Sequence, residues 1–153
     1  MKLVETWVKA PFLKEASLLL ISECAQDVFP DVCDEFAKGC VVLTSCPEAE
    51  NAGIIMSKLA SVLTCSNPRD VTVLTMEGSP HCLTLHFAAN AAIFTTKSTV
   101  PIVHFVVLEG KAIKVSSASV RVARYLHLVQ KCIQKCPEIL EDLSRHSLEH
   151  SCH

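Results

Sequence analysis

The chain has 153 residues, of which 50% are apolar and 20% are charged, and its formal net charge is −2. This composition is typical of a folded globular protein and excludes a disordered one, and the charge leaves no electrostatic footprint for nucleic acid or an anionic membrane. No apolar stretch reaches the roughly 18 residues of a membrane span, and no secretory signal is visible at the start of the sequence.

Apolar runs alternate with amphipathic segments along the chain. Residues 3–8 are expected to form an edge strand, which Pro11 stops. Further strands are predicted at residues 17–22, 41–45, 71–76, 102–108 and 112–115. Helices are predicted at residues 30–39, 47–65, 79–94 and 119–135. Three of these helices begin at a proline, which suits the first helical position.

The alternation of strands and helices predicts a three-layer α/β fold with a mainly parallel, doubly wound sheet of four to five strands. Residues 1–140 are expected to form this single domain. Residues 141–153 are expected to form a flexible tail that contains histidines.

Nine cysteines are a high count for this length. An odd number without a secretory leader favours reduced thiols or metal ligands over a framework of disulfides. We therefore expect a cytoplasmic protein, and the cytoplasm of an anaerobe fits best.

Three of the cysteines stand just after predicted buried strands. Cys24 follows strand 17–22, Cys46 follows strand 41–45, and Cys82 follows strand 71–76 after a short turn. The carboxyl ends of parallel strands line one edge of an α/β sheet, and ligands bind there. The three thiols are therefore expected to meet at this edge.

Two histidines accompany Cys82, which is expected in the first turn of its helix, where the helix dipole favours thiolate. His81 is its neighbour, and His86 lies four residues on, hence on the same helix face. Three cysteines with one histidine suit tetrahedral zinc or an iron–sulfur cluster.

The order of these motifs resembles the domain that follows the paired 4Fe-4S motifs in a family of ferredoxin-type iron–sulfur proteins of anaerobes. The resemblance covers roughly residues 8–95, with a looser echo at 102–115. It rests on the segments Ala10-Pro11-Phe12, LLLIS-Glu23-Cys24, Asp34 to Gly39, LTS-Cys46-Pro47, Lys58-Leu59 and VTVLT-Met76 to Cys82.

The resemblance implies that Cys24, Cys46 and Cys82 fall on the cysteines of that domain. The chain departs from the family at His81, where a second cysteine is typical, and at Leu83 and Thr84, where glycines are typical. No CxxCxxC run occurs here, so the ordinary cluster motif of the ferredoxin half is absent.

The remaining candidates have simpler interpretations. Cys132 and Cys136 lie four residues apart on a predicted helix, a spacing that suits one ion, but cysteines spaced in this way more often pack or face solvent. Cys33, Cys40 and Cys65 are expected to be structural. His104, inside an apolar strand, is expected to be a satisfied core histidine. Glu23 and Glu77 either support the site or face solvent. The tail residues that could take up metal are His146, His150, Cys152 and His153.

The expected function is that of an iron–sulfur or metal-binding accessory protein of anaerobic redox metabolism, with a redox protein such as a ferredoxin as partner. Three alternatives stay open: a non-catalytic ligand-sensing or docking module, a thiol enzyme that uses Cys82, and inert packing of the cysteines. No hydrolase, nucleotide-binding or dinucleotide-binding motif is present, so a non-enzymatic role is favoured while the thiol enzyme stays open. A homodimer also stays open.

Overall fold

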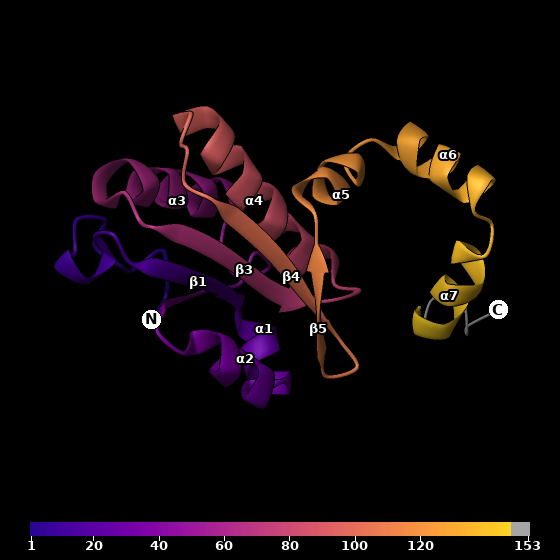
Figure 1. The fold of residues 1–153 in the computed structure, drawn as a ribbon, viewed down its shortest axis with the longest axis horizontal. Coiled ribbons are helices and arrows are strands. Elements are labelled where there is room, and N and C mark those ends of the chain that lie inside the picture. The colour runs from indigo at the N-terminus through magenta and orange to yellow at the C-terminus, as the bar shows by residue number, and fades with distance from the viewer. Residues whose placement is uncertain (148–153) are drawn as a thin grey trace. The chain divides into compact units, whose positions relative to one another are not determined.

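Five strands form one sheet in a computed structural model that describes residues 1–147 (Figure 1). Their order is β2-β1-β3-β4-β5, with the first four parallel and the last antiparallel. The strands are β1 (Ser17–Ser22), β2 (Val41–Ser45), β3 (Asp70–Met76), β4 (Ile102–Leu108) and β5 (Lys111–Val115). All five predicted strands after residue 16 are therefore present.

Helices cover both faces of this sheet. On one face lie α1 (Glu23–Val28) and α2 (Pro30–Ala37), and on the other lie α3 (Ala52–Ser66) and α4 (Pro80–Thr96) (Figure 1). The predicted three-layer, doubly wound α/β fold is confirmed.

The central strand β1 is buried on both of its faces. Leu18 and Leu20 belong to the hydrophobic cluster beneath α3 and α4, whereas Leu19 and Ile21 belong to the cluster beneath α1 and α2. A strand covered on both sides has a continuous apolar sequence, which is why residues 17–22 could be predicted as a strand from the sequence.

The segment before β1 differs from the prediction, because residues 3–8 do not form a strand. Only an isolated bridge joins Lys2 to Thr44 of β2, and a 3₁₀ helix follows at Pro11–Leu13. Leu3 and Leu13 are fully buried, so this segment contributes its apolar side chains to the core without extending the sheet.

The observed helices differ from the prediction in two further places, an additional helix α1 and a later start of α3. The segment after β1 turns at once into α1, which Ser22 caps by accepting a hydrogen bond from the Ala25 amide at 3.3 Å. Helix α3 begins at Ala52, not Pro47, because Asn51 caps it by accepting hydrogen bonds from two backbone amides. Pro47 lies in the preceding turn.

The chain divides into two compact units, Met1–Ser117 and Ala118–His153. The described part of the second unit is helical and contains α6 (Leu126–Lys135) and α7 (Ile139–His146), preceded by α5 (Ser117–Val122). The predicted helix at 119–135 is interrupted because the backbone of Tyr125 is not helical, with φ −118° and ψ 89°. The predicted boundary at residue 140 falls inside α7.

Within residues 1–147, no helix is both long enough and apolar enough to cross a bilayer.

Two leucines of α4 offer a matched test of the packing. Leu85 is fully buried, whereas Leu83, two residues earlier, is 39% exposed. Replacing Leu85 by Ala is expected to lower the free energy of unfolding by about 2–5 kcal/mol, since it leaves a cavity. Leu83→Ala is expected to cost less than about 1 kcal/mol. Urea titrations followed by circular dichroism measure both, and equal losses would contradict the assignment of the α4 face.

Candidate functional site

The sheet changes its winding direction between β1 and β3. From β1 the chain crosses to β2 on one side, whereas β3 and β4 continue on the other side. In doubly wound folds, the crevice at the carboxyl ends of the two strands on either side of this switch point binds ligands. The candidate site is therefore built from the segments that follow β1, β2 and β3.

The three strand-end cysteines all lie at this edge. Cys24 is the second residue of α1, Cys46 follows the last residue of β2, and Cys82 is the third residue of α4. The strands pair in register, with Ser22 opposite Ser45. Cys24 is exposed and Cys46 is partly exposed, whereas Cys82 is only 3% exposed.

An electrostatic interaction joins the three thiols. Burial raises the pKa of the Cys24 thiol, and the negative charges of the Cys82 and Cys46 thiolates raise this pKa further. Charges act on each other appreciably only over short distances in salt solution, about 10 Å. The Cys46 and Cys82 side chains thus lie near enough to Cys24 to affect its pKa, although 58 positions separate Cys24 from Cys82 along the chain.

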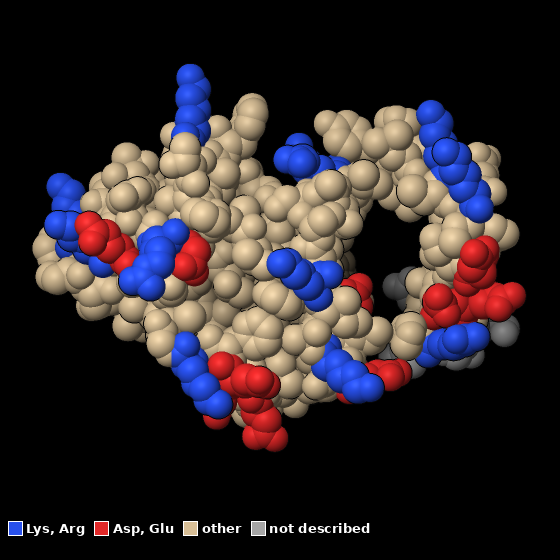
Figure 2. Space-filling view, in the orientation of Figure 1, with Lys and Arg blue, Asp and Glu red and all other residues tan. Residues whose placement is uncertain are grey.

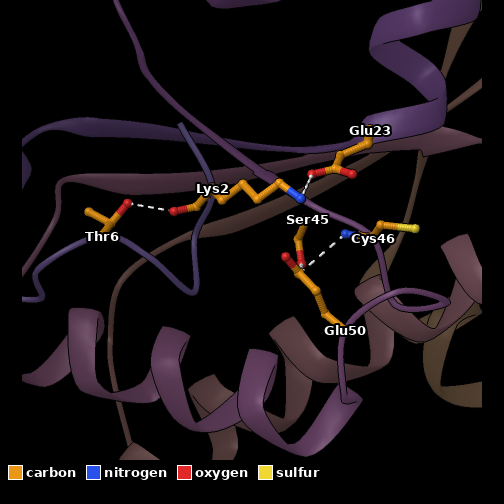
Figure 3. Close-up of polar contacts among 6 residues, drawn as sticks. All are labelled: Lys2, Thr6, Glu23, Ser45, Cys46 and Glu50. Carbon is orange, nitrogen blue, oxygen red and sulfur yellow. Dashed lines mark hydrogen bonds and ion pairs between the residues drawn. The ribbon is translucent and has the colours of Figure 1, made fainter.

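Hydrogen bonds hold the backbone of two of these cysteines. The Cys82 amide donates to the capping Ser79 hydroxyl at 3.3 Å, and the Cys46 amide donates to Glu50 Oε2 at 3.3 Å (Figure 3). The hydroxyl of Ser45 donates to the same carboxylate oxygen at 2.6 Å. Figure 3 shows the Cys46 sulfur pointing away from Glu50, so this carboxylate supports the loop and leaves the thiol exposed to other partners.

Lys2 is a site neighbour that the sequence did not indicate. Its ammonium lies 3.1 Å from Glu23 Oε1, and the hydrogen bond and charge of Glu23 raise the pKa of Lys2, with a smaller effect from Glu50 (Figure 3). Glu23 therefore has a partner, whereas Glu77 is exposed. Only the bridge between Lys2 and Thr44 brings this lysine to the edge, and no local sequence signal predicts such a contact.

His86 does not have a free ring nitrogen. Its Nε2 lies 2.8 Å from the Thr75 hydroxyl and its Nδ1 lies 2.9 Å from Nδ1 of His104. The other nitrogen of His104, Nε2, lies 3.1 Å from Asn90 Oδ1. The prediction of His86 as a metal ligand is corrected accordingly: the ring is 2% exposed and serves a hydrogen-bonded chain in the core.

The chain of hydrogen bonds has one direction when both rings are neutral. Asn90 Oδ1 can only accept, so His104 Nε2 donates to it and His104 Nδ1 accepts from His86 Nδ1. His86 Nε2 then accepts from the Thr75 hydroxyl. His104 is fully buried and satisfied, as the sequence predicted.

His81 directly precedes Cys82 in the chain, and its ring is exposed. Its Nδ1 lies 3.4 Å from Glu48 Oε2, with both side chains more than half exposed. Glu48 belongs to the loop of Cys46, and His81 precedes Cys82. This contact therefore joins the loop that carries Cys46 to the first turn of α4, which carries Cys82.

The other cysteines of the first unit are Cys33, Cys40 and Cys65, and none of them follows the carboxyl end of a strand. Cys33 is buried in the core beneath α1 and α2, as predicted, and burial raises its pKa and that of Cys40. The prediction that Cys65 is packed is wrong, because this residue is exposed. Cys132 and Cys136 lie in the second unit, on α6 and at its end. His150, Cys152 and His153 lie outside the described residues.

The described residues, 1–147, contain no group of three or more His, Cys, Asp or Glu side chains already arranged to hold a metal ion. The thiols at the edge are nevertheless the donor type that zinc and iron–sulfur clusters prefer. Their chemistry thus fits such a centre.

The sheet order and the position of the site define a doubly wound α/β protein with its candidate site at the strand ends. The family model described as a Rossmann-like domain matches residues 10–151, and the chain belongs to this family. No curated protein and no solved structure matches the sequence.

The proximity of the three thiols can be tested without any metal. In the double variant Cys46→Ser, Cys82→Ser, the pKa of Cys24 is expected to fall, because two neighbouring negative charges are lost while the effect of burial remains. The pH dependence of Cys24 alkylation, followed by peptide mass spectrometry, measures this pKa. Cys65→Ser, a distant and exposed control, is expected to leave it unchanged. An unchanged pKa in the double variant would place the sulfurs too far apart to interact.

The buried histidines make stability depend on pH. Burial lowers the pKa of both His86 and His104 from 6.5 to about 4, and the charge of His104 contributes to the shift of His86. The unfolded chain takes up these protons near pH 6.5 and the folded chain only near pH 4. Their stabilising effect is therefore complete above pH 6.5 and is lost as pH falls toward 4, with a slope of up to about 2.7 kcal/mol per pH unit for two protons.

Urea titrations between pH 7 and pH 4 measure this slope. His81→Gln, which removes an exposed histidine, is expected to retain it. The double variant His86→Leu, His104→Leu is expected to flatten it. An equally steep slope in that double variant would assign the acid sensitivity to other groups.

Proposed function

We propose that the chain is an iron–sulfur or metal-binding accessory protein, with Cys24, Cys46 and Cys82 as its ligands. The observation that supports this most is the position of the three cysteines at the carboxyl edge of the sheet, near its switch point, where Cys46 and Cys82 affect the pKa of Cys24. Negative charge on Cys82 or Cys46 repels the Cys24 thiolate, which is why these neighbours raise the pKa of Cys24. A bound cation offsets that repulsion and stabilises the deprotonated form that metal binding requires.

The fourth ligand is proposed to be His81. It adjoins Cys82, and only one of its ring nitrogens, Nδ1, is engaged, in an exposed contact with Glu48. His86 is excluded from this role by its two hydrogen bonds in the core. Three thiolates and one imidazole satisfy a tetrahedral zinc centre, and three thiolates also suit an iron–sulfur cluster.

The proposed setting is the cytoplasm of an anaerobe, with a redox protein such as a ferredoxin as partner. It rests on the resemblance of residues 8–95 to the domain that follows paired 4Fe-4S motifs in ferredoxin-type proteins. Since this chain has no CxxCxxC run, a separate ferredoxin would supply the ordinary clusters. The alternative of a thiol enzyme at Cys82 has less support, because a nucleophile that is 3% exposed is poorly accessible to a substrate.

Metal analysis of the anaerobically purified protein tests the proposal. We expect iron, with a visible absorption spectrum, or colourless stoichiometric zinc. Each of the variants Cys24→Ser, Cys46→Ser and Cys82→Ser is expected to lower the bound metal at least tenfold, because each removes a ligand. His81→Gln is expected to weaken binding by a smaller factor.

Cys65→Ser and Cys132→Ser are matched controls, since both remove exposed cysteines outside the proposed ligand set. They are expected to retain the metal of the wild type. A wild-type protein with neither iron nor zinc would refute the metal site. Selective alkylation of Cys82 in that metal-free protein would then favour the thiol enzyme, and binding to a ferredoxin alone would favour a docking module.

A further inference from the structure

Two aromatic side chains of the segment before β1 are exposed to solvent. Trp7, the only tryptophan of the chain, is 66% exposed, and Phe12 is 47% exposed. Leu3, Ala10 and Leu13 of the same segment are buried. The core therefore holds this segment through its smaller apolar residues and leaves both aromatic rings at the surface. Large apolar side chains that gather on a surface mark binding sites.

Both rings line one pocket of about 480 Å³. All of its lining residues belong to the segment 1–12, and Trp7, Pro11 and Phe12 contribute apolar surface to it. Small-molecule sites in proteins have volumes of about 300–1,000 Å³, so the pocket is large enough for such a ligand. The Ala10 amide donates to the Trp7 carbonyl at 2.9 Å, and this turn fixes the backbone between the two rings.

The one carboxylate that lines the pocket is available to a ligand, whereas the positive groups have partners. The Lys2 side chain extends toward Glu23, and its ammonium lies 3.1 Å from that carboxylate (Figure 3). The amino group of Met1 donates to the Val42 carbonyl at 3.4 Å. Glu5 is exposed and forms no hydrogen bond or ion pair with any residue from 1 to 147.

The charges around the pocket favour a positive ligand. The hydrogen bond and charge of Glu23 raise the pKa of Lys2, and the charges of Glu50 and Glu5 raise it further. A raised pKa means that these carboxylates stabilise positive charge at the pocket wall. Three carboxylates thus lie near the two positive groups, Lys2 and the amino group of Met1, so the excess charge is negative. A cation entering the pocket is attracted, whereas an anion is repelled.

The surface of the first unit does not select ligands by an extended field. On the face that Figure 2 shows, its basic and acidic side chains are interspersed, and the described residues form no broad area of one sign there. A long charged polymer is attracted by such an area. The negative charge of the pocket is therefore a local feature, and it suits a small ligand.

We propose that residues 1–12 form a binding site for a small organic cation of the substituted ammonium class. The faces of aromatic rings attract a cation, and tryptophan does so most strongly. Trp7 and Phe12 supply these rings, and the Glu5 carboxylate supplies the opposite charge. The alkyl groups of such a cation also bury apolar surface against the rings and Pro11, which a hydrated metal cation cannot do. The site is separate from the proposed thiol centre.

The fluorescence of Trp7 measures binding directly, because no other tryptophan contributes to the emission. Titration with choline chloride, used as the probe, is expected to change the emission and to saturate. The neutral isostere of choline, in which carbon replaces the quaternary nitrogen, is expected to bind about tenfold more weakly, because it has the same shape but no charge. Sodium chloride at equal concentration is expected to give no saturable change.

Two pairs of variants test the proposed contacts. Glu5→Gln removes the opposite charge and Phe12→Leu removes a ring, and each is expected to weaken choline binding about fivefold. The matched controls are Glu35→Gln, an exposed acid on α2, and Phe94→Leu, an aromatic residue on α4 that is 83% exposed. Both controls lie outside the pocket and are expected to bind choline as the wild type does.

Circular dichroism checks that every variant is folded, and the metal content of Glu5→Gln is expected to equal that of the wild type. The absence of a saturable response to choline would overturn the proposal. Equal affinity for the neutral isostere would also overturn it, because the pocket would then select shape without charge. Wild-type affinity in both Glu5→Gln and Phe12→Leu would place the bound cation elsewhere.

Discussion

The in-register parallel pairing of β1 with β2 and β3 is the constraint on which the rest of the structure depends. Ser22 lies opposite Ser45, and Ile21 lies opposite Leu74, so the three strands end at nearly the same level. The segments that follow these three strands therefore all begin at the same edge of the sheet. A slip of one residue would exchange Leu18 and Leu20 with Leu19 and Ile21 between the two faces, so both hydrophobic clusters would have to repack around side chains of different shape.

Much of the fold was predictable because buried parallel strands have continuous apolar sequences. The strands 17–22, 41–45 and 102–108 were predicted with their observed bounds. Residues 3–8 are also rich in apolar residues, but Glu5 and Thr6 interrupt the run, and the segment lies outside the sheet with only one bridge, at Lys2, to β2. The short helix α1 was missed because its capping Ser22 is also the last residue of a strand, so no separate start signal precedes it.

The position of the three cysteines at the sheet edge could be predicted from the strand order. The role of His86 could not, because it depends on tertiary contacts. Helical spacing correctly put Cys82 and His86 on one face of α4, but it carried no information about which partners that face would meet. Those partners are Thr75 and His104, which come from two other elements. The position of Lys2 near the site could not be predicted either, because it depends on a contact with Thr44, which is distant in the sequence.

The buried histidine pair also determines where α4 sits along the sheet. The face of α4 beyond His86 consists largely of alanines, including Ala88, Ala89 and Ala92, and a smooth face of this kind packs almost equally well in several positions. A slide of one turn, about 5.4 Å, would leave the imidazole nitrogens buried without partners, at about 1–3 kcal/mol each. The distance of Cys82 from the strand ends is thus set from within the core, by His104, a residue of β4 that lies on no exposed surface.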